Sequence, residues 1–487
     1  MFIDKLRLSK LIFWLVFIPF FINTTIFAFQ QPEVKPLSGD WLGVLEISGT
    51  KLRILLKITA KADKTLSATF DSIDQGAKDL PIDTITYQDG TLKFEAKPFG
   101  ISFEGKVKEG VEIVGEFKQG QAKLPLVFKP QEKPIVINRP QHPIKPYPYD
   151  EQEVSYENKN DDIKLAGTLT LPKGKAPFPA VVLITGSGPQ DRNEEIFDHK
   201  PFLVIADYLT RQGIAVLRVD DRGVGGTSKG AITATSENYA QDVLAGVEFL
   251  KTRKEINSKQ IGLIGHSEGG IIAPMVATKS SDIAFIVLLA GTGLPGDEIL
   301  KLQGALIAKA SGASEKLINV SNEIQTISYR IIREEKDINI AKAKLIEENK
   351  KFYAKFSKEE KQALGLPDLT DEQIAKSSDI LLSSWFRYFL TYDPRPTLKG
   401  VKVPVLAVNG EKDLQVPCKE NLTEIEKALK EGANKDFQIK SFPNLNHLFQ
   451  TCQTGSPQEY GQIEETFSPD VLKEMGNWIL ARVTINK

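Results

Sequence analysis

The sequence predicts an α/β fold: a mostly parallel sheet with helices on both faces and a helical cap inserted, preceded by a small antiparallel all-β domain. From about residue 151, continuous apolar runs typical of buried strands alternate with segments of helical spacing. Between about residues 294 and 392 the alternation stops and the chain is charged with helical periodicity, which predicts the cap. Residues 33–130 instead hold short, partly alternating, β-branched runs separated by turn sequences such as QDG and KEG.

Length and charge set the outer bounds. A chain of 487 residues is too long for one ordinary core, so two or three domains are expected. Apolar residues make up 41% and charged residues 26%, which is typical of a soluble globular protein. The net charge of −1 gives no attraction for a polyanion, so nucleic acid is not expected as a partner. The sequence carries no signal for oligomeric state.

The first residues predict export. Three basic residues precede the apolar run LIFWLVFIPFFI, and a more polar stretch then leads to Ala28. This order is typical of a secretory signal spanning residues 1–28, with cleavage after Ala28. The alternative is an uncleaved membrane anchor from Leu11 to about Phe29, but Pro19 and the NTT stretch make it a poor span. We expect a periplasmic or secreted protein without stable membrane insertion after cleavage.

Residues 33–130 are expected to form a small barrel or sandwich with Trp41 in its core. This region contains no cluster of acids, bases or metal-type ligands, so we interpret it as an accessory domain. Residues 131–150 are rich in proline, which disfavours helix and central strand, and predict an extended linker. The α/β domain then spans residues 151–487.

The stretch QIGLIGHSEGGIIAPMVA carries the strongest chemical signal. A G-x-S-x-G pattern is weak alone, but here an apolar strand-like run precedes it and a helix-like segment follows it. In such a turn the serine is lifted above the sheet edge, and side chains at Gly265 and Gly269 would collide with the neighbouring strand and helix. Ser267 is therefore the predicted nucleophile; a purely structural glycine-rich turn is the alternative.

A serine needs a base, and the chain offers four histidines. His142 lies in the linker, and His266 adjoins the nucleophile in the turn, where its direction is unsuited. His447 follows DFQIKSF, the predicted final strand, so its loop is expected over the same sheet edge as the nucleophile. His447 is the predicted base, with His199 as the second choice.

The base needs a carboxylate to orient it. The apolar run VPVLAVNG is followed by Asp413, which precedes His447 by 34 residues, enough for one helix and one strand. Asp413 is the predicted partner, and Glu411 is the competing carboxylate.

An oxyanion hole is the remaining requirement. The backbone N–H of Glu268, directly after the nucleophile, is the first expected donor. The second is expected in the loop LITGSGPQDRNE, at Ser187 or, as the next choice, Gly188. This loop lacks the Lys-Ser/Thr of a phosphate-binding P-loop and the full G-x-G-x-x-G spacing, so nucleotide binding is disfavoured.

Two cysteines, Cys418 and Cys452, lie in the C-terminal segment. In an oxidising compartment they could pair, and they could equally be two buried, unpaired thiols.

Four segments resemble the α/β-hydrolase superfamily: GHSEG, the DDRGVGGTS that begins at Asp220, NGEKDLQVP and NLNHLF. More narrowly they are similar to its exported esterase and serine-aminopeptidase-like branch, whose members share a GSGPQDR-type loop. The resemblance covers about Glu151 to the C-terminus, and the helical insertion resembles the family's variable cap. The family's chain order of nucleophile, acid and base is also the order found here. One departure is Thr185-Gly186, where many relatives have His-Gly, and it bears on the second oxyanion donor.

Together these features predict an exported serine hydrolase that acts as a carboxylesterase on a small-molecule ester, through an acyl-enzyme on Ser267. No metal or organic cofactor is implied. The alternative is an aminopeptidase or acyl-peptide hydrolase with the same residues. A free α-amine would then be held by one of four carboxylates near the site: Glu268, Asp191, Glu194 or Glu195. A third hypothesis is a binding protein with an inactive hydrolase domain. Trp385 and its aromatic neighbours are expected either in the apolar wall of the substrate pocket or in the core.

Overall fold

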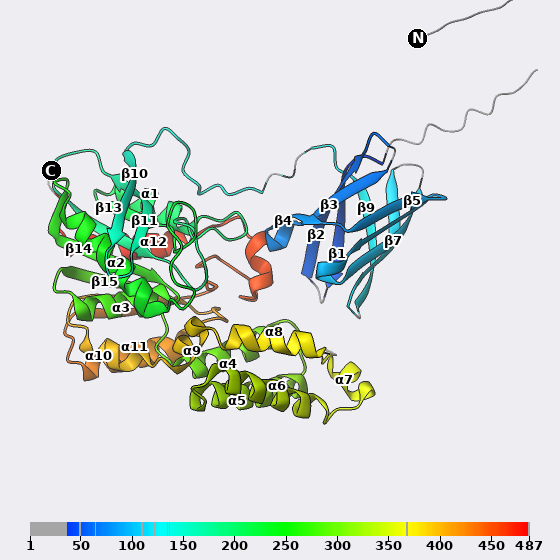
Figure 1. Ribbon diagram of the computed structural model, residues 1–487. Coiled ribbons are helices and arrows are strands. Elements are labelled where there is room, and N and C mark those ends of the chain that lie inside the picture. Colours follow the sequence, from blue (N-terminus) through cyan, green and yellow to red (C-terminus); the bar gives the residue numbers. More distant parts are fainter. Residues whose placement is uncertain are drawn as a thin grey trace, which may run out of the picture.

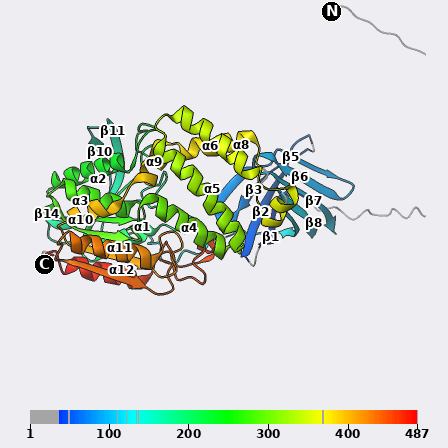
Figure 2. The same cartoon turned by 90° about the horizontal axis from the view of Figure 1, so that it is seen from below.

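The computed structural model describes residues 37–485 except residues 48–49, 64, 109–110, 121, 134, 136 and 367–368 (Figure 1). The predicted signal segment, residues 1–28, lies outside the described residues. Figures 1 and 2 show a sheet domain, an α/β domain and a layer of cap helices beside it.

The N-terminal domain is one antiparallel sheet in the order β4-β3-β2-β1-β9-β8-β7-β6-β5. The sheet curls so that β5 lies close to β3, and it encloses a core in which Trp41 is buried. Two of its strands, β4 and β5, were not foreseen, because β4 (AKDLP) has no alternating pattern and β5 (TITYQ) alternates over only five residues. The strands are β1 Gly39–Ile47, β2 Thr50–Ala60, β3 Leu66–Ser72, β4 Ala77–Pro81, β5 Thr84–Gln88, β6 Thr91–Ala96, β7 Ile101–Lys108, β8 Glu112–Gln119 and β9 Ala122–Pro130.

After β9, the chain is held against the α/β domain around Arg139. The Arg139 guanidinium donates hydrogen bonds to the carbonyls of Phe197, Gly461 and Ile463 at 2.8, 3.0 and 2.8 Å. An ion pair of 2.8 Å between Lys78 Nζ and an Asp198 carboxylate oxygen joins β4 of the first domain to the second. The expected linker is therefore anchored to the α/β domain at Arg139.

The α/β domain contains an eight-stranded sheet in the order β10-β11-β13-β12-β14-β15-β16-β17. The first two strands pair antiparallel, as does β11 with β13, and from β13 to β17 every pairing is parallel. The mostly parallel sheet predicted from the continuous apolar runs is thus confirmed. The strands are β10 Asp150–Asn158, β11 Ile163–Leu171, β12 Phe178–Ile184, β13 Ala215–Val219, β14 Ile256–His266, β15 Ile283–Leu289, β16 Val405–Gly410 and β17 Phe437–Phe442.

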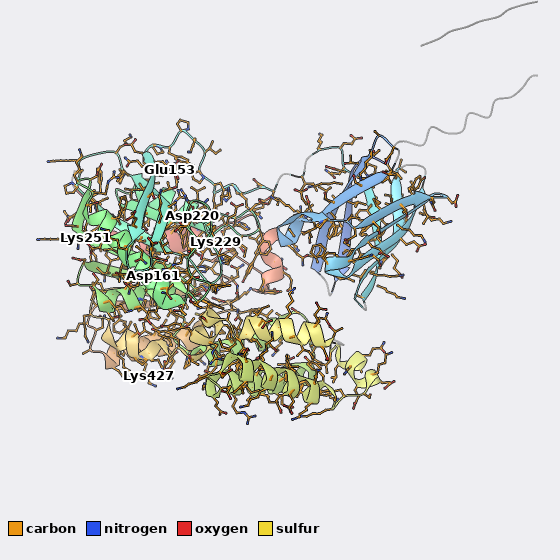
Figure 3. All side chains as sticks on the ribbon, in the orientation of Figure 1. Glu153, Asp161, Asp220, Lys229, Lys251 and Lys427 are labelled. Atoms are coloured by element: carbon orange, nitrogen blue, oxygen red, sulfur yellow. The ribbon has the colours of Figure 1, made fainter. Side chains whose placement is uncertain are left out.

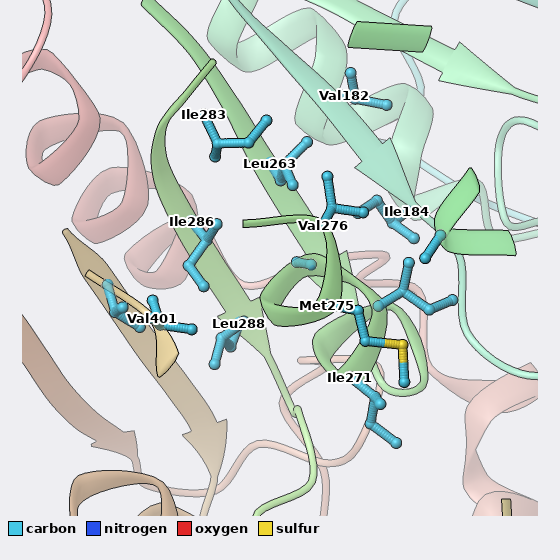
Figure 4. Packing of buried hydrophobic residues seen from close by; sticks show 14 of the residues in the cluster. Val182, Ile184, Leu263, Ile271, Met275, Val276, Ile283, Ile286, Leu288 and Val401 are labelled. Carbon is cyan, nitrogen blue, oxygen red and sulfur yellow. The ribbon is translucent and has the colours of Figure 1, made fainter. Parts of the chain in front are cut away.

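Helices bury both faces of this sheet. One face packs against α2 Ser236–Lys251, α3 Gly269–Lys279, α10 Pro394–Gly400 and α11 Cys418–Glu431, and part of that core is shown in Figure 4. The other face packs against α1 Pro201–Arg211 and α12 Pro469–Leu480. Successive residues of β12 alternate between the two cores, with Val182 in the first and Val181 in the second. Each fully buried aliphatic side chain contributes about 1.5–3 kcal/mol to the stability of the sheet that carries the site.

The charged helical segment lies between β15 and β16. It has a small core of its own, in which Tyr329, Ile332 and Leu345 are buried. Within the described ranges no helix is both long and apolar enough to cross a membrane. The cap helices are α4 Gly296–Ala310, α5 Glu315–Glu334, α6 Ile338–Tyr353, α7 Lys358–Leu364, α8 Asp371–Leu381 and α9 Ser384–Thr391.

Candidate active site

Ser267 occupies the turn between β14 and α3. Its φ of +54° lies in the left-handed region, which a non-glycine residue adopts at a cost of about 1–3 kcal/mol. Its N–H donates to the Leu289 carbonyl at 2.9 Å, which ties the turn to the end of β15. The flanking residues His266 and Glu268 are buried, whereas Ser267 is partly exposed. The turn therefore presents the serine at the C-terminal edge of the sheet, where ligands bind in open α/β folds.

The glycines around Ser267 are required by packing. A Cβ on Gly265 would lie 2.0 Å from the backbone oxygen of Gly269, at the start of α3. A Cβ on Gly269 would lie 2.2 Å from the Ile184 carbonyl oxygen, at the end of β12. These are the collisions with the neighbouring helix and strand that the sequence analysis anticipated.

The structure brings His447 and Asp413 together from two loops at the same edge. His447 Nδ1 lies 2.8 Å from Asp413 Oδ2, and both side chains are buried. The other carboxylate oxygen, Oδ1, accepts hydrogen bonds from the backbone N–H groups of Gln415 and Val416, both at 2.8 Å. The Asp413 carboxylate is consequently held in one orientation, with Oδ2 facing the imidazole.

The competing residues have other partners. Glu411 accepts a hydrogen bond from the Ser441 hydroxyl at 2.8 Å. His142 Nε2 accepts the backbone N–H of Lys200 at 3.1 Å. His199 is buried, with its ring nitrogens 2.9 Å from Thr466 Oγ1 and 3.0 Å from the Tyr460 carbonyl.

Burial, together with the nearby charge of Arg139, lowers the pKa of His199 to about 4. His199 is therefore a neutral, hydrogen-bonded core histidine at neutral pH.

The loop after β12 lies against the nucleophile. A Cβ on Gly186 would be 3.2 Å from Ser267 Cβ, so this loop backs directly onto the serine. The Gly186 N–H already donates to Glu194 Oε1 at 2.6 Å. Ser187, the next residue, is exposed. Because the Gly186 N–H is occupied, the next backbone N–H groups of this loop that could serve as the second oxyanion donor are those of Ser187 and Gly188.

The residue after the nucleophile connects three elements. Glu268 Oε1 accepts hydrogen bonds from the Ser236 hydroxyl at 2.5 Å and the Trp385 indole N–H at 2.9 Å, and Oε2 lies 3.1 Å from the same indole nitrogen. Trp385, in cap helix α9, also packs on the main core and stacks on Phe389. Its role as a polar contact between cap and serine turn was missed, because sequence spacing gives no sign of a contact across 117 residues.

Buried carboxylates dominate the electrostatics beside the serine. Burial raises the pKa of Glu268, and it raises that of Asp221 to about 7, with Glu194 and Glu268 adding to the shift of Asp221. Asp221 and Glu268 line a cavity of about 50 Å³ next to Gly186.

Their neighbour Asp220 is neutralised by Arg192, whose guanidinium also reaches Glu153. Figure 3 labels Asp220 and Glu153 in the α/β domain.

Four carboxylates were candidates for binding a substrate amine, and the structure places only two of them beside the serine turn. Glu194 and Glu268 lie beside the serine turn. Asp191 instead accepts backbone N–H groups of its own turn, from Asn193 and Glu195, and Glu195 pairs with Lys200 at 3.3 Å. No group of three or more His, Cys, Asp or Glu side chains in the described part of the chain could hold a metal ion.

The two cysteines are free and buried. Burial raises the pKa of Cys418 to about 12 and that of Cys452 to about 11. Of the two alternatives that the sequence left open, the structure has unpaired thiols.

Comparison with known proteins adds an independent observation. Residues 161–435 match the family model described as X-Pro dipeptidyl-peptidase (S15 family). The esterase EstD of Thermotoga maritima is 27% identical over 332 residues, which covers 67% of this chain and 68% of that protein.

Among solved structures, the Pyrococcus furiosus esterase Pf2001 aligns with a TM-score of 0.42 at 16% identity, over 72% of this chain and 99% of that one. Est1E from Butyrivibrio proteoclasticus, with ferulic acid bound, aligns with a TM-score of 0.37 at 18% identity, over 68% of this chain and 98% of that one.

Proposed function

Because the chain belongs to the X-Pro dipeptidyl-peptidase (S15) family of α/β hydrolases, we propose that it hydrolyses carboxylic esters through an acyl-enzyme on Ser267. The supporting observation is the 2.8 Å contact between Asp413 Oδ2 and His447 Nδ1, in loops that lie at the same sheet edge as the strained serine. The similarity to an esterase favours an ester as substrate.

In the proposed mechanism, the nitrogen of His447 that faces away from Asp413, Nε2, takes the proton from the Ser267 hydroxyl as the oxygen attacks the acyl carbonyl. Asp413 keeps the proton on Nδ1 and stabilises the imidazolium. The alcohol then leaves with the proton from Nε2, and water releases the acid by the reverse steps.

The developing oxyanion would be bound by the backbone N–H groups of Glu268 and Ser187. Each such donor typically contributes about 10²–10³ in kcat. Assigning Ser187 rather than Gly186 follows from the hydrogen bond that already occupies the Gly186 N–H.

The test is hydrolysis of p-nitrophenyl acetate and butyrate by the wild type and by Ser267→Ala. We expect Ser267→Ala to lose both hydrolysis and labelling by a fluorophosphonate. Ser281→Ala, which changes an exposed serine just beyond the far end of α3, is the matched control and should behave as wild type. Retained hydrolysis in Ser267→Ala would refute the assignment.

A second candidate is cleavage of a peptide that has a free amine, as the family description suggests. The observation that favours it is the buried Glu268 carboxylate, whose hydrogen-bond donors Ser236 and Trp385 are both neutral. An ammonium group would supply the missing counter-charge. Hydrolysis of an aminoacyl p-nitroanilide, and its loss when the α-amine is acetylated, would favour this candidate; activity on esters alone would exclude it.

The proposal includes export, with residues 1–28 as a cleaved signal. The intact mass of the exported chain should correspond to a start at Phe29. A mass that retains residues 1–28 would favour the membrane-anchor alternative.

A further inference from the structure

His266 lies between the loops that carry the proposed oxyanion donor and the proposed base. Its Nε2 is 3.0 Å from the backbone oxygen of His447, and its Nδ1 is 2.9 Å from Glu194 Oε1. Glu194 Oε1 also accepts the Gly186 N–H at 2.6 Å. The pair thus links the loop after β12, the end of β14 and the loop after β17, which are far apart in sequence.

The hydrogen-bond partners favour one protonation state of this pair. A carbonyl oxygen only accepts, so His266 Nε2 carries a proton. Glu194 Oε1 also accepts the Gly186 N–H, which stabilises the carboxylate form and favours placing the proton between Oε1 and Nδ1 on the imidazole. His266 is then an imidazolium paired with a carboxylate, both buried.

The charged surroundings agree with this protonation. Burial by itself lowers the pKa of His266, but the charge and hydrogen bond of Glu194, the hydrogen bond to the His447 carbonyl and the charge of Asp413 outweigh it, so the pKa is raised. The titratable groups that face His266 are Glu194, Asp413 and the ring of His447, whose centroid is 4.8 Å away. Asp221 lies behind Glu194 and interacts with its charge.

The backbone shows that Glu194 is held in place for this contact. Its φ of +52° is in the left-handed region, unusual for a glutamate, and its N–H donates to the Asp191 carbonyl at 2.9 Å. Strain of this kind persists where surrounding structure over-determines it, and it concentrates at functional sites. A Cβ on Gly186 would fit only tightly between Glu194 and Ser267, since it would lie 3.2 Å from both Glu194 Oε1 and Ser267 Cβ.

We propose that Glu194 and His266 are positioning residues, which hold the loop of the Ser187 N–H and the loop of His447 in register with Ser267. This inference rests on the proposed function. The pair touches no substrate itself. It acts by fixing the Gly186 N–H on one side and the backbone of His447 on the other.

Two substitutions at one position separate positioning from simple packing. Glu194→Ala removes the acceptor for Gly186 and the partner of Nδ1. Glu194→Gln removes the carboxylate charge but keeps an oxygen at the Oε1 position, which can accept from both the Gly186 N–H and His266 Nδ1–H. Glu195→Ala is the matched control, because the adjacent Glu195 is exposed and pairs with Lys200.

With p-nitrophenyl butyrate, we expect Glu194→Ala to lower kcat about 10–100-fold, less than the loss of a whole oxyanion donor, with KM within about twofold. As pH rises through the raised pKa of His266, the imidazolium loses its proton and the ion pair with Glu194 is lost. The wild-type kcat should therefore fall on the alkaline side. Glu194→Gln should recover most of kcat and lack this alkaline fall. Circular dichroism checks that each variant is folded.

Two kinetic outcomes would overturn the inference: a kcat of Glu194→Ala within twofold of Glu195→Ala, or equal losses in Glu194→Ala and Glu194→Gln at every pH. Nitrogen NMR of ¹⁵N-histidine-labelled protein supplies a readout without turnover. Just above the ordinary histidine pKa of 6.5, it should show one histidine that is still doubly protonated and that becomes neutral in Glu194→Ala, and its absence from the wild type would also overturn the inference. Retained activity in Ser267→Ala would instead refute the proposed function, while the NMR result would still decide the state of the pair.

Discussion

Replacing Trp385 by phenylalanine removes the indole N–H that reaches Glu268 from the cap. The nitrogen lies 2.9 and 3.1 Å from the two carboxylate oxygens, and the remaining side-chain donor is the Ser236 hydroxyl at 2.5 Å. A hydrogen bond to a charged group contributes about 1.5–3 kcal/mol, and a neutral one about 0.5–1.5 kcal/mol. We therefore expect Trp385→Phe to lower the free energy of unfolding by about 2 kcal/mol at pH 8, plus a smaller loss from poorer packing on Phe389.

The ionisation of Glu268 sets the direction in which the free energy of unfolding changes with pH. Its pKa is raised in the folded protein by burial, so between the unfolded value near 4.5 and the folded value the native state holds the extra proton. Stability falls as pH rises through that window. Losing the indole N–H destabilises the ionised form of Glu268 and raises its folded-state pKa further, so the pH range over which stability falls extends to higher pH. The destabilisation by Trp385→Phe should consequently be larger at pH 8 than at pH 5.

The assay is urea unfolding followed by circular dichroism at 222 nm. The α-helices of the described chain all lie in the α/β domain and its cap, so this signal reports on the unit that holds the contact. A double-mutant cycle with Glu268→Gln separates the hydrogen bond from packing, because the packing loss is common to both backgrounds. The expected coupling is about 1 kcal/mol. A coupling below about 0.3 kcal/mol, or equal destabilisation at both pH values, would refute the reasoning.

Two further outcomes follow from the same site. In Asp413→Asn, the backbone N–H groups of the following turn hold the amide oxygen at Oδ1, so the amide nitrogen faces His447 Nδ1 and forces the wrong imidazole tautomer. We expect kcat to fall about 10⁴-fold with little change in the unfolding curve. A loss under tenfold would contradict the proposed triad. Cys418 and Cys452 should react with a thiol reagent only after unfolding, because burial raises their pKa values to about 12 and 11; rapid modification of the native protein would contradict their burial.

The fold class was predictable because its signals are local. Continuous apolar runs identify parallel strands buried on both faces, as the pairing from β13 to β17 shows. The turn around Ser267 was predictable for the same reason, since contacts within a few residues make Gly265 and Gly269 obligatory. By contrast, β4 pairs through the backbone without an apolar pattern, so periodicity did not reveal it, and β5 alternates over only five residues, which is too short for a clear signal.

The sequence by itself determined which residue types were available: one serine in a strand-to-helix turn, four histidines, and Asp413 ahead of His447. Only the tertiary structure decided that His266 joins Glu194 and that Trp385 reaches Glu268, across 72 and 117 residues. Buried polar groups must find partners wherever the packed loops place them, and those partners are set by the meeting of distant loops at one sheet edge. Sequence spacing describes the turn that lifts the serine; it does not describe which side chains close around that turn once the chain has folded.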